Sequence, residues 1–276
     1  MAKVDNEIRG KLALITGASG GIGAACARAL WQQGVNLALT YSSSEDKINA
    51  LKDELWGLPV SQDASTSPSS PSGDNDGAPH PLISTHRVDV GSADDISRLF
   101  RSIQELHGRD GPDILVSNAG HGKRIPDIAD ISIEEFDYTI DINLRASFIL
   151  SKLSIPPMAA RKWGRIIFVS SIAAHGAGIN GCHYAASKAG LQGLMKCLAW
   201  KHAKDGITVN DVAPAMIGET GMIPDAKYVE GTPGDVKNIP LGRLGTPQEV
   251  ANVVLMFCQT GYMTGQSVLL SGGIKA

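Results

Sequence analysis

The chain lacks most features that mark a secreted or membrane protein. Its 276 residues include only four cysteines, which are far apart and show no CxxC spacing, so neither a disulfide framework nor a zinc site is predicted. No segment approaches the roughly 18 consecutive apolar residues of a membrane span, and residues 1–17 lack the apolar segment of a signal peptide. We therefore expect a cytoplasmic protein with no membrane partner.

Charge is also scarce. Charged residues make up 19% of the chain, and the formal net charge is −3. Proteins that bind the phosphate backbone of nucleic acid carry a marked excess of positive charge, so we expect no nucleic-acid partner. Hydrophobic residues make up 43%, which is enough to bury a full core.

Apolar runs alternate with segments of helical period along most of the chain. Strands are predicted at 11–16, 35–41, 82–88, 113–118, 164–171, 207–213 and 267–272, and helices at 21–33, 92–107, 132–163, 183–204 and 246–259. Short strands that are apolar almost throughout are typical of a parallel sheet covered by helices on both faces. The pattern predicts a single doubly wound α/β domain over 1–276, with a seven-stranded parallel sheet.

Two segments interrupt this alternation. Residues 61–81 are almost entirely Ser, Pro, Gly, Asn and Asp, so they cannot bury enough surface to offset their ordering entropy. We predict a mobile surface insertion there, with a phosphorylated or partner-binding segment as the alternative. Residues 214–240 are rich in Gly and Pro but keep apolar side chains such as Met216 and Met222. A long loop of this kind is typical of a substrate lid; a packed surface loop is the alternative.

The stretch TGASGGIG at 16–23 has the setting of a dinucleotide-binding turn. It follows one predicted strand and opens a helix, and the next strand begins within about 30 residues. Gly17 would allow a sharp exit from the strand, Gly21 a close approach to a pyrophosphate, and Gly23 tight packing of helix on sheet. Ala24 stands where a P-loop needs lysine, which disfavours an NTPase. A structural turn without a ligand is the alternative.

These residues, with others further along the chain, resemble the short-chain dehydrogenase/reductase family. The matching positions are the turn at 16–23, Asn118, Ala119 and Gly120 after the fourth strand, Asn143, Ser171 after the fifth strand, and Tyr184 with Lys188. Within the family, the chain most resembles 3-oxoacyl-carrier-protein reductases and related ketoreductases. The resemblance implies a Rossmann fold, reversible reduction of a small-molecule carbonyl to an alcohol with NADP(H), and a homotetramer, with a dimer as the alternative.

The resemblance implies that four residues are catalytic: Asn143, Ser171, Tyr184 and Lys188. Ser171 would polarise the carbonyl, and Tyr184 would protonate the oxygen as it gains negative charge. Because free tyrosine has a pKa of about 10, a nearby cation is needed to tune it. Lys188 lies one helical turn away and can supply that charge, and by resemblance it also binds the nicotinamide ribose. Asn143 would hold a water that links Lys188 to solvent.

Other interpretations of these positions remain open. Ser171 could be a strand-end turn residue and Asn143 a local backbone cap. His175 and His183 flank the tyrosine, but their spacing matches no common zinc pattern, and Ser171 is not in a GxSxG elbow. We therefore predict neither a metal site nor a hydrolase and leave both histidines unassigned.

The end of the second predicted strand favours NADPH over NADH. An NAD-preferring site usually has an acidic residue there, whereas this chain has Tyr41 and Ser42, followed by Ser43 and Ser44, whose hydroxyls can donate hydrogen bonds to a phosphate. The other predicted cofactor contacts are Ser19 and Ile22 in the glycine turn, Asp89 and Val90 after the third strand, and Pro214, Ile217 and Thr220 after the sixth.

Several functions compete with a ketoreductase. An alcohol, polyol or steroid dehydrogenase would use the same residues, and a family member could also act as an isomerase or dehydratase. A catalytically silent NADP-binding regulator is disfavoured, because such a protein has no need to retain Ser171, Tyr184 and Lys188 together. The sequence does not identify the substrate.

Overall fold

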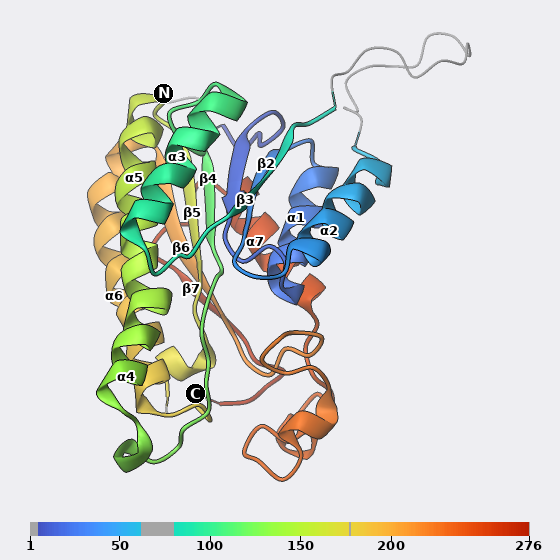
Figure 1. Cartoon of the computed structure of the whole chain (residues 1–276), viewed down its shortest axis with the longest axis vertical. Helices are drawn as coiled ribbons and strands as arrows, with labels where there is room; N and C mark the ends of the chain where they lie inside the picture. The colour runs from blue at the N-terminus through green and yellow to red at the C-terminus, as the bar shows by residue number, and fades with distance from the viewer. Residues whose placement is uncertain (1–4, 62–79, 177, 276) are drawn as a thin grey trace.

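The computed structural model describes residues 5–61, 80–176 and 178–275. In this part of the chain, parallel strands form one seven-stranded sheet with the order β3-β2-β1-β4-β5-β6-β7 (Figure 1). The strands are β1 (Leu12–Ile15), β2 (Asn36–Tyr41), β3 (Ile83–Arg87), β4 (Ile114–Ser117), β5 (Gly164–Val169), β6 (Ile207–Pro214) and β7 (Ser267–Leu270). The order reverses between β1 and β4, which is the doubly wound Rossmann arrangement. The predicted fold class is confirmed.

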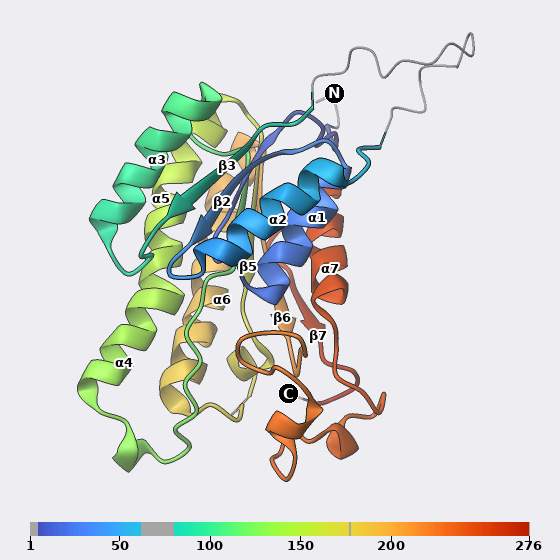
Figure 2. The same ribbon diagram turned by 45° about the vertical axis from the view of Figure 1, so that its right-hand side comes forward.

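Helices cover both faces of the sheet (Figures 1 and 2). One layer contains α1 (Gly21–Gln32), α2 (Glu45–Gly57) and α7 (Pro247–Gln259), and the other contains α3 (Ala93–His107), α4 (Ile133–Ile140), α5 (Ala146–Ala160) and α6 (Cys182–His202). Successive side chains of a strand point to opposite faces, so Leu14 joins the core beneath α3, α5 and α6 while Ile15 joins the core beneath α1 and α7. Each strand therefore contributes to both cores.

The single helix predicted at 132–163 is wrong in detail. A π-helical turn, Asp141–Arg145, separates α4 from α5. The apolar pattern of 132–163 did not reveal this turn. Such turns are frequent at functional sites, and this one contains Asn143.

The loop between β6 and α7 extends beyond the carboxyl end of the sheet (Figure 1). It contains two short 3-10 turns, Ala226–Val229 and Val236–Asn238. Val229 and Ile239 are buried, and Ile217 forms a backbone bridge to Gly245, so the loop packs against the domain. The predicted insertion at 61–81 lies almost entirely outside the described residues.

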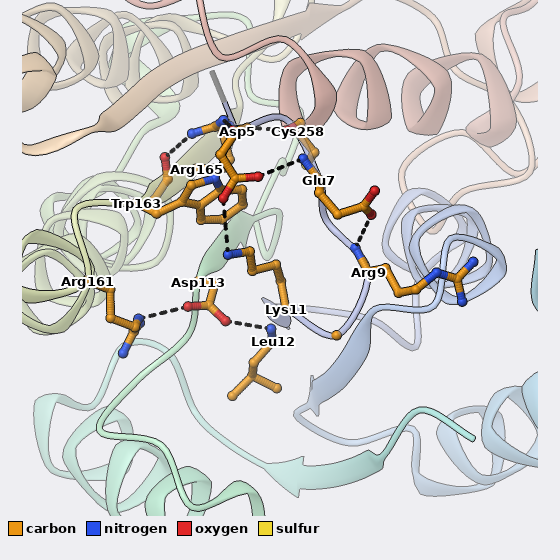
Figure 3. Close-up of polar contacts among 12 residues, drawn as sticks. Asp5, Glu7, Arg9, Lys11, Leu12, Asp113, Arg161, Trp163, Arg165 and Cys258 are labelled. Carbon is orange, nitrogen blue, oxygen red and sulfur yellow. Dashed lines mark hydrogen bonds and ion pairs between the residues drawn. The ribbon is translucent and has the colours of Figure 1, made fainter. Parts of the chain in front are cut away.

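An ion-pair network joins elements at the opposite, amino end of the sheet (Figure 3). Asp113, which is almost fully buried, accepts a 2.9 Å hydrogen bond from the backbone N–H of Leu12. Its carboxylate also pairs with Arg109 at 2.9 Å and with Arg161 at 2.8 Å. Asp113 thus ties together β1, the start of β4 and the end of α5.

No helix in the described part of the chain is long and apolar enough to cross a membrane.

Candidate active site

The predicted site residues gather at the carboxyl ends of the strands, where the strand order reverses. In an open α/β sheet this is where ligands bind. The glycine turn follows β1, Asn118 follows β4, and Ser171 follows β5. The turn and β4 are fastened to each other, because the Thr16 hydroxyl accepts hydrogen bonds from the backbone N–H groups of Asn118 and Ala119, both at 3.0 Å.

At three positions of the turn at 16–23 only glycine fits. Gly17 has a φ of +65°, and a Cβ on Gly23 would lie 2.4 Å from the Gly17 carbonyl oxygen. A Cβ on Gly21 would lie 2.3 Å from the Glu219 carbonyl oxygen, which belongs to the loop after β6. Gly20 begins α1 without a side-chain cap, so the first N–H groups of this helix are available to an anion.

A cavity of about 460 Å³ opens beside this turn. Its lining includes Ser19, Gly20, Lys47 and Glu219. Lys47 was not singled out in the sequence, because one exposed lysine in a first helical turn carries no distinctive pattern. It is a cation on the side of the turn where α2 begins.

The ends of β2 and β3 hold the predicted adenosine contacts. Tyr41 is buried and Ser42 is exposed. The Arg87 guanidinium donates a 3.2 Å hydrogen bond to the Ser42 carbonyl oxygen, which places a second cation beside the predicted serines 42–44. The pairing of Tyr41 with Arg87 across β2 and β3 explains this position; sequence analysis missed Arg87 because strand register is not readable locally.

Other predicted cofactor residues lie at the same edge of the sheet. Asp89 is exposed and accepts a 2.9 Å hydrogen bond from the Gly91 N–H, and Val90 is buried. Ile217 is buried, and the Thr220 hydroxyl is engaged within its own loop, where it donates to the Ile217 carbonyl oxygen at 3.1 Å. Pro214 is the last residue of β6.

Tyr184 and Lys188 lie one turn apart on α6 and are both buried, with 7% and 4% of their surface exposed. The Lys188 Nζ lies 5.7 Å from the centre of the Tyr184 ring and donates a 2.9 Å hydrogen bond to the Val169 carbonyl oxygen on β5. Ser171 lies two residues beyond the end of that strand and accepts a hydrogen bond from the Ala173 N–H at 3.1 Å. One helix and one strand end thus bring the three side chains together.

Burial dominates the electrostatics of these groups. Desolvation raises the pKa of Tyr184, and its hydrogen-bonding interaction with the Ser171 side chain acts in the opposite direction. Desolvation lowers the pKa of Lys188 to about 8, while the charge of Asp211 acts to raise it. At neutral pH Tyr184 therefore keeps its proton and Lys188 is mainly charged.

Asn143 completes the cluster from the π-helical turn. Its side chain accepts a 2.8 Å hydrogen bond from the His121 N–H and donates to the His121 carbonyl oxygen at 2.9 Å and to the Ser187 hydroxyl at 2.9 Å. A Cβ on Gly120 would lie 3.3 Å from the Asn143 Oδ1 and 3.4 Å from the Lys188 Nζ. Asn143 and Lys188 therefore face the same point beside Gly120.

The histidines near the site have different environments. His175 is exposed and its Nε2 lies 3.1 Å from the Ser267 hydroxyl. His183 is fully buried, and neither ring nitrogen has a hydrogen-bond partner among the described residues. His121, which sequence analysis did not select, bonds through Nε2 to Glu135 at 2.7 Å. In the described ranges, no group of His, Cys, Asp and Glu is placed to hold a metal ion.

The chain is similar to known oxidoreductases over nearly its whole length. Residues 11–67 match the short chain dehydrogenase family, and residues 76–275 match the family described as Enoyl-(Acyl carrier protein) reductase. The 3-oxoacyl-[acyl-carrier-protein] reductase FabG of Rickettsia bellii is 36% identical over 97% of this chain and 98% of that protein. Dehydrogenase/reductase SDR family member 4 of Homo sapiens is 31% identical over 97% and 88%.

Solved structures show the same similarity. A short-chain type dehydrogenase/reductase from Mycobacterium marinum superposes with a TM-score of 0.81 at 28% identity, covering 97% of this chain and 96% of that one.

Proposed function

The chain belongs to the short-chain dehydrogenase/reductase family, and from this premise we propose that it reduces a ketone to a secondary alcohol with NADPH, reversibly. The observation that carries the proposal is the convergence of Ser171, Tyr184 and Lys188 at the carboxyl ends of the strands. The activity for which the FabG relatives are named supports a 3-oxoacyl thioester as the substrate class to try first.

The residues present fit a dinucleotide. The glycine turn leaves backbone N–H groups and no side chains where a pyrophosphate would approach. The adenosine and nicotinamide halves would lie on either side of this pyrophosphate site. The residues that would hold them are Ser19 and Ile22 in the turn and Asn118, Ala119 and Gly120 after β4. The bound cofactor supplies the hydride.

The protein's own task is to handle the proton and the charge on oxygen. Ser171 donates a hydrogen bond to the substrate oxygen, and Tyr184 transfers its proton to the same oxygen as negative charge develops. Lys188 stabilises the tyrosinate that remains, because its ammonium lies near the ring. Asn143 holds the water through which Lys188 regains a proton from solvent.

Two cations support NADPH as the cofactor. Arg87 lies against Ser42, and Lys47 lines the cavity that also contains Ser19. Both can pair with a 2′-phosphate, whereas no carboxylate ends β2 to bind the ribose hydroxyls of NAD. The hydroxyls of serines 42–44 add hydrogen-bond donors at the same place.

The loop at 214–240 is proposed as the substrate lid. It borders the site through the Glu219 backbone, which packs against Gly21. Pro214, Ile217 and Thr220 belong to the part of the loop nearest the nicotinamide end. Its apolar side chains suit a medium-sized carbonyl compound.

A homotetramer is proposed, with a dimer as the alternative. Large apolar side chains are exposed on the helices that cover one face of the sheet: Ile133 and Tyr138 on α4, Phe148 on α5 and Trp200 on α6. Trp200 is 91% exposed, and contacts between copies would remove such surface from water. Light scattering at micromolar concentration tests this; a monomer contradicts it.

The proposed activity is tested by following NADPH absorbance, starting from NADPH with 3-oxoacyl thioesters, quinones and ketosteroids and from NADP⁺ with hydroxysteroids and polyols. Oxidation of NADPH with the thioesters supports a 3-oxoacyl reductase, and turnover confined to steroids or polyols supports a dehydrogenase of those alcohols. Conversion of substrate without oxidation of NADPH indicates an isomerase or dehydratase. Tight NADPH binding without any turnover indicates a silent regulator.

A further inference from the structure

A carboxylate is buried beneath the helix that carries the Tyr184 and Lys188 pair. Asp211 lies in β6 and is 0% exposed. It is paired with Phe168 of β5 on one side and with Ser267 of β7 on the other. The next pair along the same two strands is Val169 with Val212, and the Val169 carbonyl oxygen accepts the hydrogen bond from the Lys188 Nζ. The Lys188 ammonium therefore contacts β5 one residue pair away from Asp211.

The side chain of Asp211 points to the face of the sheet that α6 covers. Val209 belongs to the core beneath α6, whereas Val212 belongs to the opposite core. Because side chains alternate along a strand, Asp211 shares the face of Val209. Its carboxylate therefore enters the same buried layer as Lys188.

Few groups in this layer can compensate a buried negative charge. Neither carboxylate oxygen of Asp211 has a hydrogen-bond partner of standard geometry among the described residues. Two hydroxyls lie nearby, from Ser170 directly after β5 and from Ser267 in β7. The charged or titratable groups that act on Asp211 are Lys188 on α6 and His175 in the segment after β5. Of these two, only Lys188 is buried.

Lys188 also lacks a close partner that compensates its charge within the described structure. Its only hydrogen bond found in the described structure is to a neutral backbone carbonyl, and burial by itself favours the uncharged amine. An ammonium in this position needs a negative charge nearby. Burial raises the pKa of Asp211 and lowers that of Lys188, and the charge of each group counteracts the effect of burial on the other.

We propose that Asp211 is the buried counter-ion of Lys188 and acts as a positioning residue that keeps this lysine protonated beside Tyr184. Asp211 would act on Lys188 through its charge and not through a direct contact, and this interaction does not need the cofactor. Its catalytic consequence rests on the proposed carbonyl reduction. His175 and Ser267 extend the pair toward the surface, because the His175 Nε2 lies 3.1 Å from the Ser267 hydroxyl.

The direct test measures how strongly Lys188 holds its proton. The protein is labelled with ¹³C at the lysine ε-carbons, Lys188→Ala identifies the resonance of this lysine, and the titration is followed by NMR without cofactor. In Asp211→Asn, which keeps the shape and removes the charge, the proton affinity of Lys188 falls at least ~10-fold. Ser267→Ala, which keeps the carboxylate, gives a smaller decrease.

Asp205→Asn is the matched control. Asp205 is a partly buried carboxylate whose partners are Lys162 and His202, both away from the site, so its removal leaves the titration of Lys188 unchanged. A Lys188 titration that is the same in Asp211→Asn as in the wild type overturns the proposal.

A second measurement needs no variant at position 211 and stands if Asp211→Asn does not fold. In the wild type labelled with ¹³C at aspartate carboxyl groups, Asp211 is ionised at neutral pH and its resonance shifts again as Lys188 loses its proton. A carboxyl group that stays protonated until Lys188 has titrated overturns the proposal.

Activity separates this inference from the proposed function. The pH dependence of kcat is measured with a ketone that the protein reduces. As the pH rises, kcat of Asp211→Asn falls at a lower pH than kcat of the wild type, while KM changes little. An unmoved profile contradicts the role in catalysis. If no carbonyl compound is reduced at all, the proposed function fails, while the two NMR titrations still decide whether Asp211 and Lys188 are paired.

Discussion

Lys188 on α6 donates a 2.9 Å hydrogen bond to the Val169 carbonyl oxygen on β5. This contact fastens the helix that carries Tyr184 to the strand that leads into Ser171. The proposed proton donor and the group proposed to polarise the carbonyl are therefore held by the same two elements, and their spacing does not depend on the loop at 214–240. Rigid elements hold catalytic groups more accurately than loops do.

The proposed preference for NADPH depends on charge at the ends of β2 and β3. Replacing Arg87 with Glu removes a cation and adds a carboxylate beside Ser42, where the proposed 2′-phosphate lies. We expect KM for NADPH to rise about 10-fold or more, the size of one lost charge-assisted contact, with little change for NADH. Steady-state kinetics with both cofactors measures this.

The control for this variant is Arg101→Glu, since Arg101 is an exposed arginine on α3. It leaves both cofactor KM values unchanged. Wild-type efficiency with NADH equal to or above that with NADPH would contradict the preference itself.

Stability depends on Asp113 at the other end of the sheet. This buried carboxylate pairs with two arginines and accepts the Leu12 N–H. Asp113→Ala leaves those groups without their partner, and we expect a loss of about 3 kcal/mol in the free energy of unfolding. Urea denaturation measures the loss, and Asp141→Ala, which breaks an exposed pair with Arg145, changes stability by less than about 1 kcal/mol. Equal effects of the two substitutions would contradict the account.

Stability at mildly acidic pH depends on His86 in β3. This buried side chain bonds to the Ser84 hydroxyl at 2.7 Å, and burial lowers its pKa to about 4, with the nearby His107 charge acting in the same direction. In the unfolded chain the pKa is about 6.5. Between these values the unfolded state binds a proton that the folded state does not, so stability falls as the pH decreases through this range.

The expected loss from this histidine between pH 7 and pH 5 is about 2 kcal/mol. His86→Gln has no such titration, and its stability decreases less over the same range. Urea denaturation at the two pH values compares them; an equal decrease in both proteins would rule out His86 as the cause.

Much of the fold and part of the site could be predicted from local sequence. Strands such as β1 and the turn after it are encoded by short apolar runs and by glycines whose positions leave no room for a Cβ. Helical spacing places Tyr184 and Lys188 on one face of a helix, and the resemblance gives the pair its catalytic role. The resemblance added Ser171 and Asn143, which lie far apart in the chain and meet only in the folded domain.

Other features depend on register and packing, which the sequence does not display. Arg87 reaches Ser42 because β2 and β3 pair in one register. Asp211 is one of three polar residues in β6, with Thr208 and Asn210, and its proximity to Lys188 requires the crossing of α6 over β6. The π-helical turn at Asp141–Arg145 was also not evident from the apolar pattern of 132–163.

The central claim is that Tyr184 is the proton donor in carbonyl reduction, and Tyr184→Phe tests it most directly. This substitution removes only the hydroxyl from a side chain that is 7% exposed, so the fold and NADPH binding are expected to persist. We predict that kcat with a turned-over ketone falls by about 100-fold or more, the range for losing a general acid, while the Kd for NADPH measured by fluorescence stays within about twofold. Turnover close to that of the wild type, with the same substrate and cofactor, would contradict the account.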